Sequence, residues 1–508
     1  MTEQIAIQPA DVHNEQLLAN VHPVDWKNPT PQDRYNLVVI GAGSAGLITA
    51  AIAAGLGARV ALVERHLMGG DCLNVGCVPS KSLIRVARTI AEARLAEAFG
   101  LPVGASTEAD FGAVMERVRR IRARISHEDA AHRYRDELGV DVFFGSARFA
   151  GPDVIDVDGT QLRFKKAVIA TGARAAAPSI EGLEKAGYLT NETVFELTER
   201  PNRLGVIGSG PIGAELAQAF RRLGSGVTVF GRAPQLLPRE DADAAQVVED
   251  QFEREGIAML LGCKLRRVEV LDAGKRIHVT TANGEEKATD VDAILVAVGR
   301  TPNVEGLNLE AVGVEFDSQR GVHVNDYLQT HNPAIYAAVD ISMAWKFTHA
   351  ADAAAKIVVQ NALFLRTKKL SSLVMPWCTY TDPEVAHVGL YEREATERGI
   401  EITTFKIPLR EVNRAVTDGE DTGFVKIHVK KGSDRILGAT IVASHAGEMV
   451  SEVTLAMGNK LGLGAILATL HPYPTQAEAL KRAAGAYMRS RATPRLSRIL
   501  ARFMALRR

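Results

Sequence analysis

Two stretches of this chain repeat one pattern, and the repeat constrains its fold more than any other feature of the sequence. Residues 35–46 read YNLVVIGAGSAG, and residues 203–213 read RLGVIGSGPIG. Each combines an apolar strand, a glycine turn and the start of a helix, and a second apolar strand follows each helix. In a dinucleotide-binding βαβ unit the first glycine makes the turn, the second admits a pyrophosphate and the third lets the helix pack on the strand. The duplication predicts an α/β chain with two Rossmann-like folds.

The first copy carries a complete set of candidate dinucleotide ligands. They are the turn residues and the acidic end of the following strand: Gly41, Gly43, Ser44, Ala45, Gly46 and Glu64. A phosphate is expected at the N-terminus of the helix, where unpaired N–H groups and the helix dipole favour an anion. The carboxylate of Glu64 is suited to accept hydrogen bonds from a ribose. We therefore predict that this fold binds a dinucleotide.

The second copy lacks the acid. Its candidate ligands in the turn are Gly208, Gly210, Ile212 and Gly213. The strand that follows, VTVFGR, ends in Gly231 and Arg232. A missing carboxylate beside an arginine suits the 2′-phosphate of NADPH better than the free ribose of NADH. Arg232 as a solvated loop residue, with NADH as the cofactor, stays open as the alternative.

Cysteines are few, and two of the four stand together. Cys72 and Cys77 lie in GGDCLNVGCVPSKSL, just before a predicted helix. Their C-x4-C spacing differs from a C-x2-C zinc half-site, and no second ligand pair follows, so no metal site is predicted. Two thiols at a helix N-terminus favour a thiolate, and a redox-active disulfide is the natural interpretation. Cys263 and Cys378 are isolated, and we expect buried, inert thiols there.

Charge and hydropathy exclude several classes of protein. The 60 basic and 60 acidic side chains give a formal net charge of zero, whereas nucleic-acid binders carry a marked basic excess. An uncharged stretch separates Arg34 from Arg59, but its glycines indicate a strand, a turn and a helix rather than a membrane span. No basic and apolar secretory signal is visible at the N-terminus. We expect a cytoplasmic protein that does not bind nucleic acid.

The remaining sequence predicts further elements around the two folds. Helical periodicity covers residues 80–97 and 108–138, and Asn283-Gly284 suits a hairpin turn. Residues 1–34 are polar and contain prolines, which predicts an extension that wraps on the surface or is partly disordered. From about residue 370, strands alternate with helices at 447–463 and 474–490, which is typical of an α+β domain.

Residues 489–508 form a basic tail. They hold seven arginines and no acid, and Leu496, Ile499, Leu500 and Phe503 recur at helical spacing. This pattern predicts an amphipathic helix. Either the helix lies on a membrane surface or an acidic partner, or it packs on the second subunit of a dimer.

The order of motifs along the chain carries a family resemblance. CLNVGCVPSK follows GAGSAG and Glu64, and after it come ATGARA (170–175), GSGPIGAE, AVGRTPN (297–303), IYAAVDI (335–341) and HPYPTQAE (471–478). This series resembles the class I flavoprotein disulfide reductases, which include dihydrolipoamide dehydrogenase, glutathione reductase and mercuric reductase. The resemblance implies a glutathione reductase-like homodimer with FAD and NAD(P)H as cofactors. It implies an FAD-binding domain over 35–175 and 297–366, an NAD(P)H-binding domain over 176–296 and a dimerisation domain over 370–488.

The resemblance also implies roles for single residues. Cys72 corresponds to the thiol that meets the substrate, and Cys77 to the thiol that lies against the flavin. Lys81 corresponds to the lysine near the flavin N5, Glu215 to the glutamate that pairs with it, and Asp340 to the aspartate that binds the ribityl chain. Further contacts with FAD are expected from Gly70, Asp71, Thr171 and Gly172, and with the nicotinamide nucleotide from Gly299.

Two positions depart from the family pattern. Val339 stands where the family usually has glycine, so its side chain is expected to crowd the cofactor or to require φ values that valine disfavours. Tyr473, with Glu478 downstream, stands where disulfide reductases use a histidine of the partner subunit as the acid and base for dithiol exchange. Tyrosine, with a pKa of about 10, is a poor base near neutrality. His471 is displaced by two residues, and we expect an interface or helix-entry role for it.

The tyrosine favours the mercuric reductase branch of the family. FTHAADAAAKIVVQNALF (347–364) and YTDPEVAHVGL (380–390) also resemble that branch, although the tail has no cysteine pair of the kind that mercuric reductases carry there. We predict an enzyme that uses NAD(P)H, preferably NADPH, to reduce a Cys72–Cys77 disulfide and then a metal ion or small electrophile. The alternatives are dihydrolipoamide dehydrogenase or another disulfide reductase, a membrane-associated flavoprotein that reduces quinone or oxygen, and a non-catalytic protein that only holds FAD.

Overall fold

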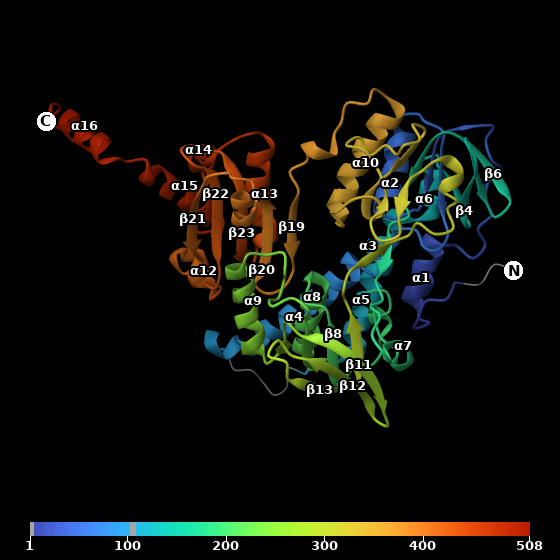
Figure 1. Ribbon diagram of the computed structural model, residues 1–508, viewed down its shortest axis with the longest axis horizontal. Coiled ribbons are helices and arrows are strands. Elements are labelled where there is room, and N and C mark those ends of the chain that lie inside the picture. The colour runs from blue at the N-terminus through green and yellow to red at the C-terminus, as the bar shows by residue number, and fades with distance from the viewer. Residues whose placement is uncertain (1–4, 102–107) are drawn as a thin grey trace. The chain divides into compact units, whose positions relative to one another are not determined.

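The computed structural model describes residues 5–101 and 108–508 (Figure 1). The chain forms two compact units. The first runs as far as Pro234 and resumes over Ile257–Ser372, and the second joins Gln235–Gly256 to Leu373–Arg508. This division follows compactness rather than ligand binding, so the boundaries of the FAD, NAD(P)H and dimerisation domains given above stay a prediction.

The first glycine turn follows the central strand of a mostly parallel sheet in the first unit. Strand β1 (Tyr35–Ile40) pairs in parallel with β2 (Val60–Glu64) and β6 (Thr160–Ile169). Parallel pairing continues from β2 to β3 (Asp141–Phe144) and from β6 to β18 (Ile335–Ala337), while β4 (Ala147–Gly151) and β5 (Val154–Val157) add an antiparallel edge. Helix α2 (Ser44–Gly55) starts at the turn and packs against α10 (Thr348–Leu363). Burial on both faces explains why the central strands β1 and β2 are mostly apolar.

The second copy builds the same arrangement around β8 (Arg203–Ile207). This strand pairs in parallel with β9 (Gly226–Phe230) and β14 (Ala293–Val296), and β10 (Ala258–Leu260) extends the sheet. Helix α8 (Pro211–Arg222) follows the turn. Beside it lies an antiparallel sheet of β11 (Lys264–Leu271), β12 (Gly274–Thr280) and β13 (Glu286–Val291), and its β12–β13 hairpin confirms the turn predicted at Asn283-Gly284.

The first and third glycines of both turns occupy positions that admit no side chain. Gly41 has φ +101°, and a Cβ there would lie 2.4 Å from the carbonyl oxygen of Ala170. A Cβ on Gly46 would lie 1.8 Å from the carbonyl oxygen of Gly41. In the second copy, a Cβ on Gly213 would lie 2.0 Å from the carbonyl oxygen of Gly208. The third glycine of each motif therefore lets the helix reach the strand, as the sequence predicts.

Further elements complete the first unit. They are α3 (Gly70–Asn74), α4 (Cys77–Arg94), α5 (Phe111–Ile125), α6 (Ala131–Asp136), α7 (Leu183–Ala186), β7 (Ala173–Ala175), β15 (Arg300–Pro302), β16 (Phe316–Asp317) and β17 (Gly321–Val322). The helix predicted over 108–138 is interrupted by a 3₁₀ turn over Ser126–Asp129. Ser126 donates its hydroxyl to the carbonyl of Ala123 at 2.6 Å, which competes with continued helical bonding.

The N-terminal extension is more ordered than the sequence predicts. It forms helix α1 (Val12–Val21), whose first turn is capped by the side chain of Asp11. Leu17 and Val21 are fully buried, and Arg119 of α5 forms an ion pair with Asp11 at 2.5 Å. The expected partial disorder is therefore wrong for residues 11–21, while the first four residues lie outside the described part of the chain.

The second unit is an antiparallel sheet covered by helices. Its strand order is β19 (Pro376–Thr379), β20 (Glu384–Gly389), β23 (Ile436–Ala443), β22 (Phe424–Lys430) and β21 (Ile402–Pro408). The helices of the unit are α9 (Ala242–Glu255), α11 (Glu392–Glu397), α12 (Asn413–Asp418), α13 (Ala446–Gly458), α14 (Leu463–Ala468), α15 (Glu478–Ser490) and α16 (Pro494–Ala505). The α+β character predicted from residue 370 onwards is confirmed.

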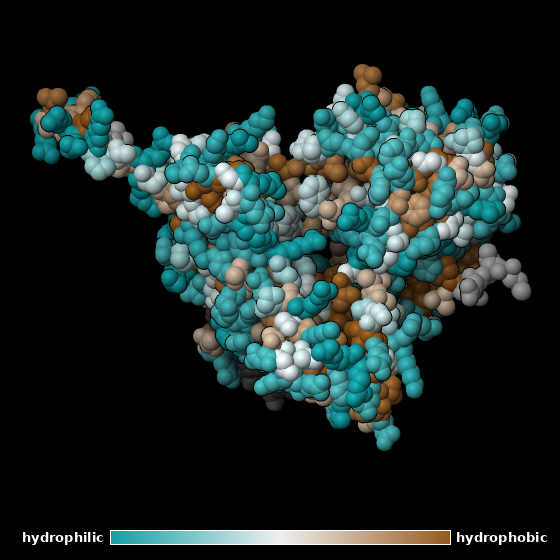
Figure 2. Space-filling model, viewed as in Figure 1, coloured by the Kyte–Doolittle hydropathy of each residue, from teal (hydrophilic) through white to brown (hydrophobic). Residues whose placement is uncertain are grey.

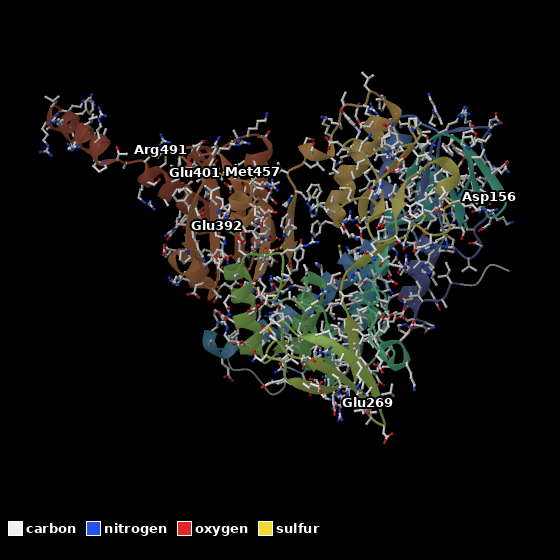
Figure 3. The ribbon with its side chains drawn as sticks, viewed as in Figure 1. Asp156, Glu269, Glu392, Glu401, Met457 and Arg491 are labelled. Atoms are coloured by element: carbon white, nitrogen blue, oxygen red, sulfur yellow. The ribbon has the colours of Figure 1, made fainter. Side chains whose placement is uncertain are left out.

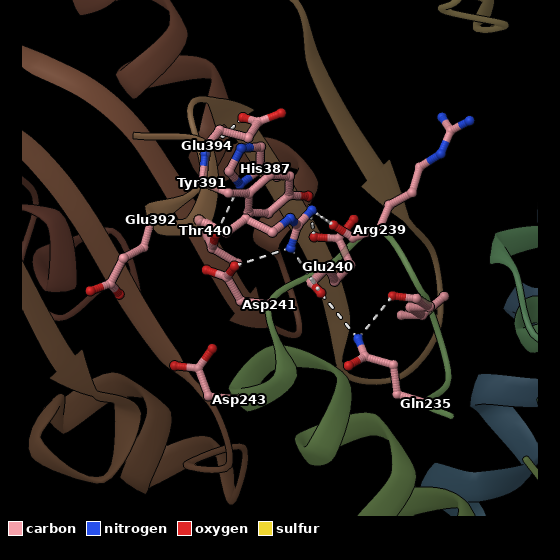
Figure 4. A network of polar contacts seen from close by, with 12 residues as sticks. Gln235, Arg239, Glu240, Asp241, Asp243, His387, Tyr391, Glu392, Glu394 and Thr440 are labelled. Atoms are coloured by element: carbon pink, nitrogen blue, oxygen red, sulfur yellow. Dashed lines mark hydrogen bonds and ion pairs between the residues drawn. The ribbon is translucent and has the colours of Figure 1, made fainter. Parts of the chain in front are cut away.

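A buried polar network fastens the segment before α9 to the sheet of the second unit (Figure 4). Glu240 accepts hydrogen bonds from Trp377 Nε1 at 2.9 Å and from the Tyr391 hydroxyl at 2.7 Å. The ring of Tyr391 stacks on His387 with centroids 3.6 Å apart. Burial raises the pKa of Glu240 and lowers the pKa of His387 to about 3. Residues 235–256 thus belong physically to the C-terminal unit, which no local sequence pattern indicates.

Across the described residues, no helix combines the length and the apolar character that crossing a bilayer requires.

Candidate active site

Cys72 and Cys77 lie on two consecutive helices, of which the first is short. Cys72 is inside α3, and Cys77 is the first residue of α4. Gly76 joins the helices, and a Cβ on it would lie 2.6 Å from the carbonyl oxygen of Asp71, so the turn between the two cysteines requires glycine. Both cysteines are free thiols in this structure. The predicted position of a cysteine at a helix N-terminus is confirmed.

Hydrogen bonds divide the two thiols into one acid and one thiolate. The thiol of Cys72 donates to Cys77, and Thr348 Oγ1 lies 3.5 Å from Cys77 Sγ. These bonds, together with the charge of Lys81, lower the pKa of Cys77 to about 6. The same bond and burial raise the pKa of Cys72. At neutral pH the reduced pair therefore holds a proton on Cys72 and a negative charge on Cys77.

Lys81 and Glu215 form an ion pair close to the thiols. Lys81 is one helical turn beyond Cys77 on α4, and its Nζ lies 2.7 Å from Glu215 Oε2 on α8. Glu215 is buried. A buried carboxylate holds the lysine charge in one place, and that charge favours the thiolate.

A second cluster of charge surrounds Arg300, which sequence reasoning missed. Its guanidinium contacts the carboxylate of Asp71, and its Nε lies 3.0 Å from Asp340 Oδ2. Burial raises the pKa of Asp340. Its place within the AVGRTPN motif could have marked Arg300 as a candidate site residue. The sequence alone does not show that it pairs with Asp71 and Asp340, two of the predicted FAD ligands.

Val339, which precedes Asp340, has a φ of 74°. A left-handed backbone costs an L-residue about 1–2 kcal/mol, and a β-branched side chain is more restricted still. The sequence predicts either crowding of the cofactor or an unfavourable φ at this position, and the structure has the unfavourable φ. The turn keeps the shape that glycine would adopt.

The first glycine turn and its surroundings fit FAD. Gly43 and Gly70 approach so closely that a Cβ on Gly70 would lie 2.6 Å from Gly43 Cα, which leaves bare backbone at the N-terminus of α2. Glu64 accepts hydrogen bonds from the backbone N–H groups of Ala42 and His66 at 2.7 and 2.8 Å, and burial raises its pKa. The residues that would hold FAD here include Ser44, Ala45, Asp71, Gly172 and Asp340.

The two other predicted FAD segments meet in the structure. Strands β7 and β15 pair antiparallel, so that ATGARA and AVGRTPN lie side by side. Thr171 donates its hydroxyl to the carbonyl of Asn303, and Asn303 Nδ2 donates back to the carbonyl of Thr171, both at 2.9 Å. These reciprocal bonds hold the position of Thr171.

The second glycine turn leaves room for a nicotinamide nucleotide. A Cβ on Gly210 would meet nothing within 4 Å, so the N-terminus of α8 is open to a phosphate. The two copies can be aligned through one backbone hydrogen bond. The N–H of Gly41 donates to the carbonyl of Val63 at 2.8 Å, and the N–H of Gly208 donates to the carbonyl of Phe230 at 2.9 Å. Gly231, which follows Phe230, therefore occupies the position that Glu64 has in the first copy.

Packing explains the missing acid. A Cβ on Gly231 would lie 2.7 Å from the Leu261 side chain and 2.9 Å from Ser209, so no side chain fits there. The next residue, Arg232, is exposed, as is Ile212 of the first turn of α8. Gly299, the remaining predicted nucleotide contact, has φ +135° and therefore also favours glycine.

The residues of the predicted C-terminal motif lie in the second unit. Tyr473 is 71% exposed, and its hydroxyl accepts a hydrogen bond from Asn413 Nδ2 at 3.0 Å. Glu478 pairs with Arg482 at 3.0 Å. His471 bonds to Glu452 at 3.1 Å with its own side chain almost fully buried, which agrees with a structural role. Asn413 was not found from the sequence because only its neighbourhood in space gives it meaning.

Of the two other cysteines, Cys263 is buried as expected, whereas Cys378 is only partly buried. Cys263 is 2% exposed, and burial raises its pKa. Cys378 packs against the core of the second unit. Within residues 5–101 and 108–508, no group of three or more His, Cys, Asp and Glu side chains is arranged to hold a metal ion.

Comparison with known proteins decides the family. The family model described as pyridine nucleotide-disulphide oxidoreductase matches residues 35–355, and the model of the dimerisation domain of the same family matches residues 375–484. The chain belongs to this family. As a pyridine nucleotide-disulphide oxidoreductase it is a flavoprotein enzyme that uses FAD and NAD(P)H, and its dimerisation domain supports a homodimer. The fold class and the resemblance predicted from the sequence are both confirmed.

Relatives of this oxidoreductase carry more than one activity. A mercuric reductase from Lysinibacillus sphaericus is 38% identical over 453 residues, which cover 89% of this chain and 82% of the relative. A dihydrolipoyl dehydrogenase from Thermus scotoductus is 34% identical over 464 residues, which cover 89% and 97%. The solved structure of the HOCl-induced flavoprotein disulfide reductase RclA from Escherichia coli has a TM-score of 0.80 at 27% identity, and the match covers 89% of this chain and 99% of that one.

Proposed function

We propose that this enzyme uses NADPH to reduce a soft metal ion presented as a thiol complex, in the manner of a mercuric reductase. The observation that carries the proposal is the tyrosine at position 473, where a disulfide reductase needs a base, combined with a protonated Cys72. Identities of 36–38% to several mercuric reductases support the same branch.

Because Cys72 is protonated, a disulfide substrate and a metal-ion substrate make different demands on the site. To attack a disulfide, Cys72 must first lose its proton to a base, and a phenol such as that of Tyr473 is a poor proton acceptor near neutrality. A soft metal ion binds thiolate sulfur and expels the proton as it binds, so it needs no base. The site is therefore better matched to a metal complex than to lipoamide or glutathione disulfide.

The reaction balances as a two-electron reduction. FAD held at the first glycine turn would supply the hydride chemistry that links NADPH to the Cys72–Cys77 disulfide. Cys72 and Cys77, once reduced, take the metal ion from its two external thiolates. The metal gains the electron pair, the external thiols leave protonated, and the cysteines return to the disulfide. Overall, NADPH, one proton and a divalent metal bis-thiolate give NADP⁺, the metal atom and two thiols.

Other side chains have supporting roles in this proposal. Thr348 and Lys81 stabilise the Cys77 thiolate, and Glu215 holds Lys81 in position. Tyr473 and Glu478 belong to the part of the site that the partner subunit supplies in related reductases. Arg232 binds the 2′-phosphate, which makes NADPH the preferred nucleotide over NADH. A cytoplasmic location is part of the proposal, because a dithiol enzyme of this kind works in a reducing compartment.

One comparison of substrates tests the proposal. NADPH oxidation by the purified holoenzyme is measured with Hg(II) plus excess thiol, with lipoamide, with glutathione disulfide and with a quinone. The thiol complex of Hg(II) is expected to give the highest kcat/KM. If lipoamide or glutathione disulfide proves better, the interpretation of Tyr473 is wrong, and a quinone as the best acceptor assigns the protein to another class.

The variant Tyr473→His sharpens this comparison. It restores a base at the family position, so turnover of lipoamide should rise by roughly 100-fold or more, which is the usual contribution of a general base. Tyr473→Phe is the matched control, because it leaves the aromatic ring and adds no base. Equal lipoamide turnover in both variants would contradict the role given to this position.

A further inference from the structure

The C-terminal helix α16 presents an apolar face to solvent. Ile499, Leu500 and Phe503 share one side of the helix and are 55%, 49% and 48% exposed. Met504 extends the same surface and is also exposed. Figure 2 shows brown apolar atoms beside teal polar atoms on this helix, at the end marked C in Figure 1. Contiguous exposed apolar side chains on a helix indicate a surface that is covered in use.

Arginines line the edge of this face. Arg495, Arg498 and Arg502 follow a stripe with three- and four-residue spacing along α16. The guanidinium of Arg507 lies 5.1 Å from the centre of the Phe503 ring. No acidic residue occurs between residues 489 and 508, so nothing within the tail neutralises its positive charge.

The helix is joined to the body of its unit by a short connection. Helix α15 ends at Ser490, and Arg491, labelled in Figure 3, donates to the hydroxyl of Tyr487 at 3.0 Å. Pro494 then starts α16 at a position where a missing N–H costs no helical bond. The start of the tail is thus anchored on α15, while each described side chain beyond it is exposed.

We propose that α16 docks the enzyme on an anionic lipid surface, with the helix axis in the plane of the interface. A basic stripe beside an apolar face matches the two contacts that such a surface offers, lipid phosphates and acyl chains. Arginine suits phosphate because its guanidinium donates two parallel hydrogen bonds. With 12 residues, α16 is too short to span a bilayer, so it lies on the surface.

A second copy of the chain fits this face less well. The dimerisation domain of the family ends at residue 484, before α16 begins. Arginines at the edge of a subunit interface stay solvated and add little to binding, whereas lipid headgroups supply negative charge over the whole surface. The proposal is independent of which substrate the enzyme reduces.

Vesicle co-sedimentation of the full-length holoenzyme tests the proposal. The vesicles contain either phosphatidylcholine alone or equal parts of phosphatidylcholine and phosphatidylglycerol. Binding is expected only to the anionic vesicles and should weaken with added salt. In the triple variant Arg495→Gln, Arg498→Gln, Arg502→Gln, binding should fall on the order of 100-fold, because each basic residue near an anionic surface contributes about fivefold.

Two further variants separate charge from apolar insertion. The control triple variant Arg148→Gln, Arg163→Gln, Arg267→Gln removes the same charge from exposed arginines elsewhere, and it should bind vesicles like the native chain. The double variant Ile499→Ser, Phe503→Ser keeps every arginine and should lose most of the binding. If it binds fully, the attraction is only electrostatic and insertion of the helix is refuted.

Deletion of residues 491–508 completes the test. The shortened chain should stay dimeric in size-exclusion chromatography and should no longer sediment with anionic vesicles. Sedimentation equal to that of the native chain would overturn the proposal. A shift from dimer to monomer, without any vesicle binding by the native chain, would assign α16 to the subunit interface instead.

Discussion

Arg122 ties the N-terminal helix to the helix that carries Cys72. Its Nη1 donates to the carbonyl of Asn74 at 2.8 Å, and its Nη2 donates to Asn14 Oδ1 at 2.6 Å. All three residues are at most 5% exposed. Asn74 ends α3, two residues after Cys72, and its Nδ2 donates in turn to the carbonyls of Met68 and Gly70. We expect Arg122→Met, which keeps the volume and removes both donors, to loosen α1.

Two opposing terms set the size of the effect. A hydrogen bond from a charged donor contributes about 1.5–3 kcal/mol, so the two bonds together contribute about 3–6 kcal/mol. Burial lowers the pKa of Arg122 to about 10, and that shift corresponds to a desolvation cost of about 3 kcal/mol. The bonds exceed the cost, and the variant should lose about 2 kcal/mol of local stability, since it also leaves two buried acceptors unpaired.

Native-state hydrogen exchange measures this loss where it occurs. A local loss of about 2 kcal/mol should speed exchange of the α1 amides by roughly 30-fold. The amides of β22 and β23, in the other unit, serve as the internal control and should not change. The variant Arg122→Lys keeps the charge but donates to only one acceptor at a time. Its α1 amides should therefore exchange at a rate between those of the native chain and of Arg122→Met. Unchanged α1 exchange in Arg122→Met would refute the reasoning.

Three further predictions concern the thiolate, the nucleotide and the strained turn. Because the pKa of Cys77 is lowered to about 6, thiolate-to-flavin absorbance of the reduced enzyme should be lost as pH falls through about 6, and Cys77→Ala should lack it at every pH. Arg232→Glu should shift the NADPH-to-NADH ratio of kcat/KM towards NADH, and an unchanged ratio would remove Arg232 from the site. Val339→Gly relieves about 1–2 kcal/mol of backbone strain but adds about 0.5–1 kcal/mol of unfolded-state entropy, so it should raise the melting temperature slightly. A lower melting temperature in scanning calorimetry would show that valine packing outweighs the strain.

Local patterns predicted the parts of the site that a short segment determines. The glycine turns at Gly41 and Gly208 depend only on neighbouring residues, because the buried strand, the turn and the start of the helix lie within a dozen positions. The place of Cys77 at the start of α4 follows from the same short-range logic. The hairpin at Asn283-Gly284 was predicted because the turn type needs those residues.

Long-range contacts were not predictable in this way. Thr348 and Arg300 reach the thiols and Asp71 only after the chain has folded back from the far side of the second nucleotide fold. Helix α1 looked like a disordered extension because the partners of its polar residues, Arg119 and Arg122, lie on α5, far along the sequence. Periodicity identifies an amphipathic helix, but it does not name the surface on which the helix packs.

The fastening of Glu240 to Trp377 and Tyr391 has a consequence for biosynthesis. Residues 235–256 leave the ribosome in the middle of the first unit, yet they belong to the second unit, whose last strand, β23, ends at Ala443. That strand is made about 190 residues later, which at ~5–20 residues per second is a delay of roughly 10–40 s. During this interval the carboxylate of Glu240 lacks Trp377 and Tyr391, and α9 lacks β23. The nascent chain is therefore most exposed to misfolding and to chaperone capture between the synthesis of α9 and that of β23.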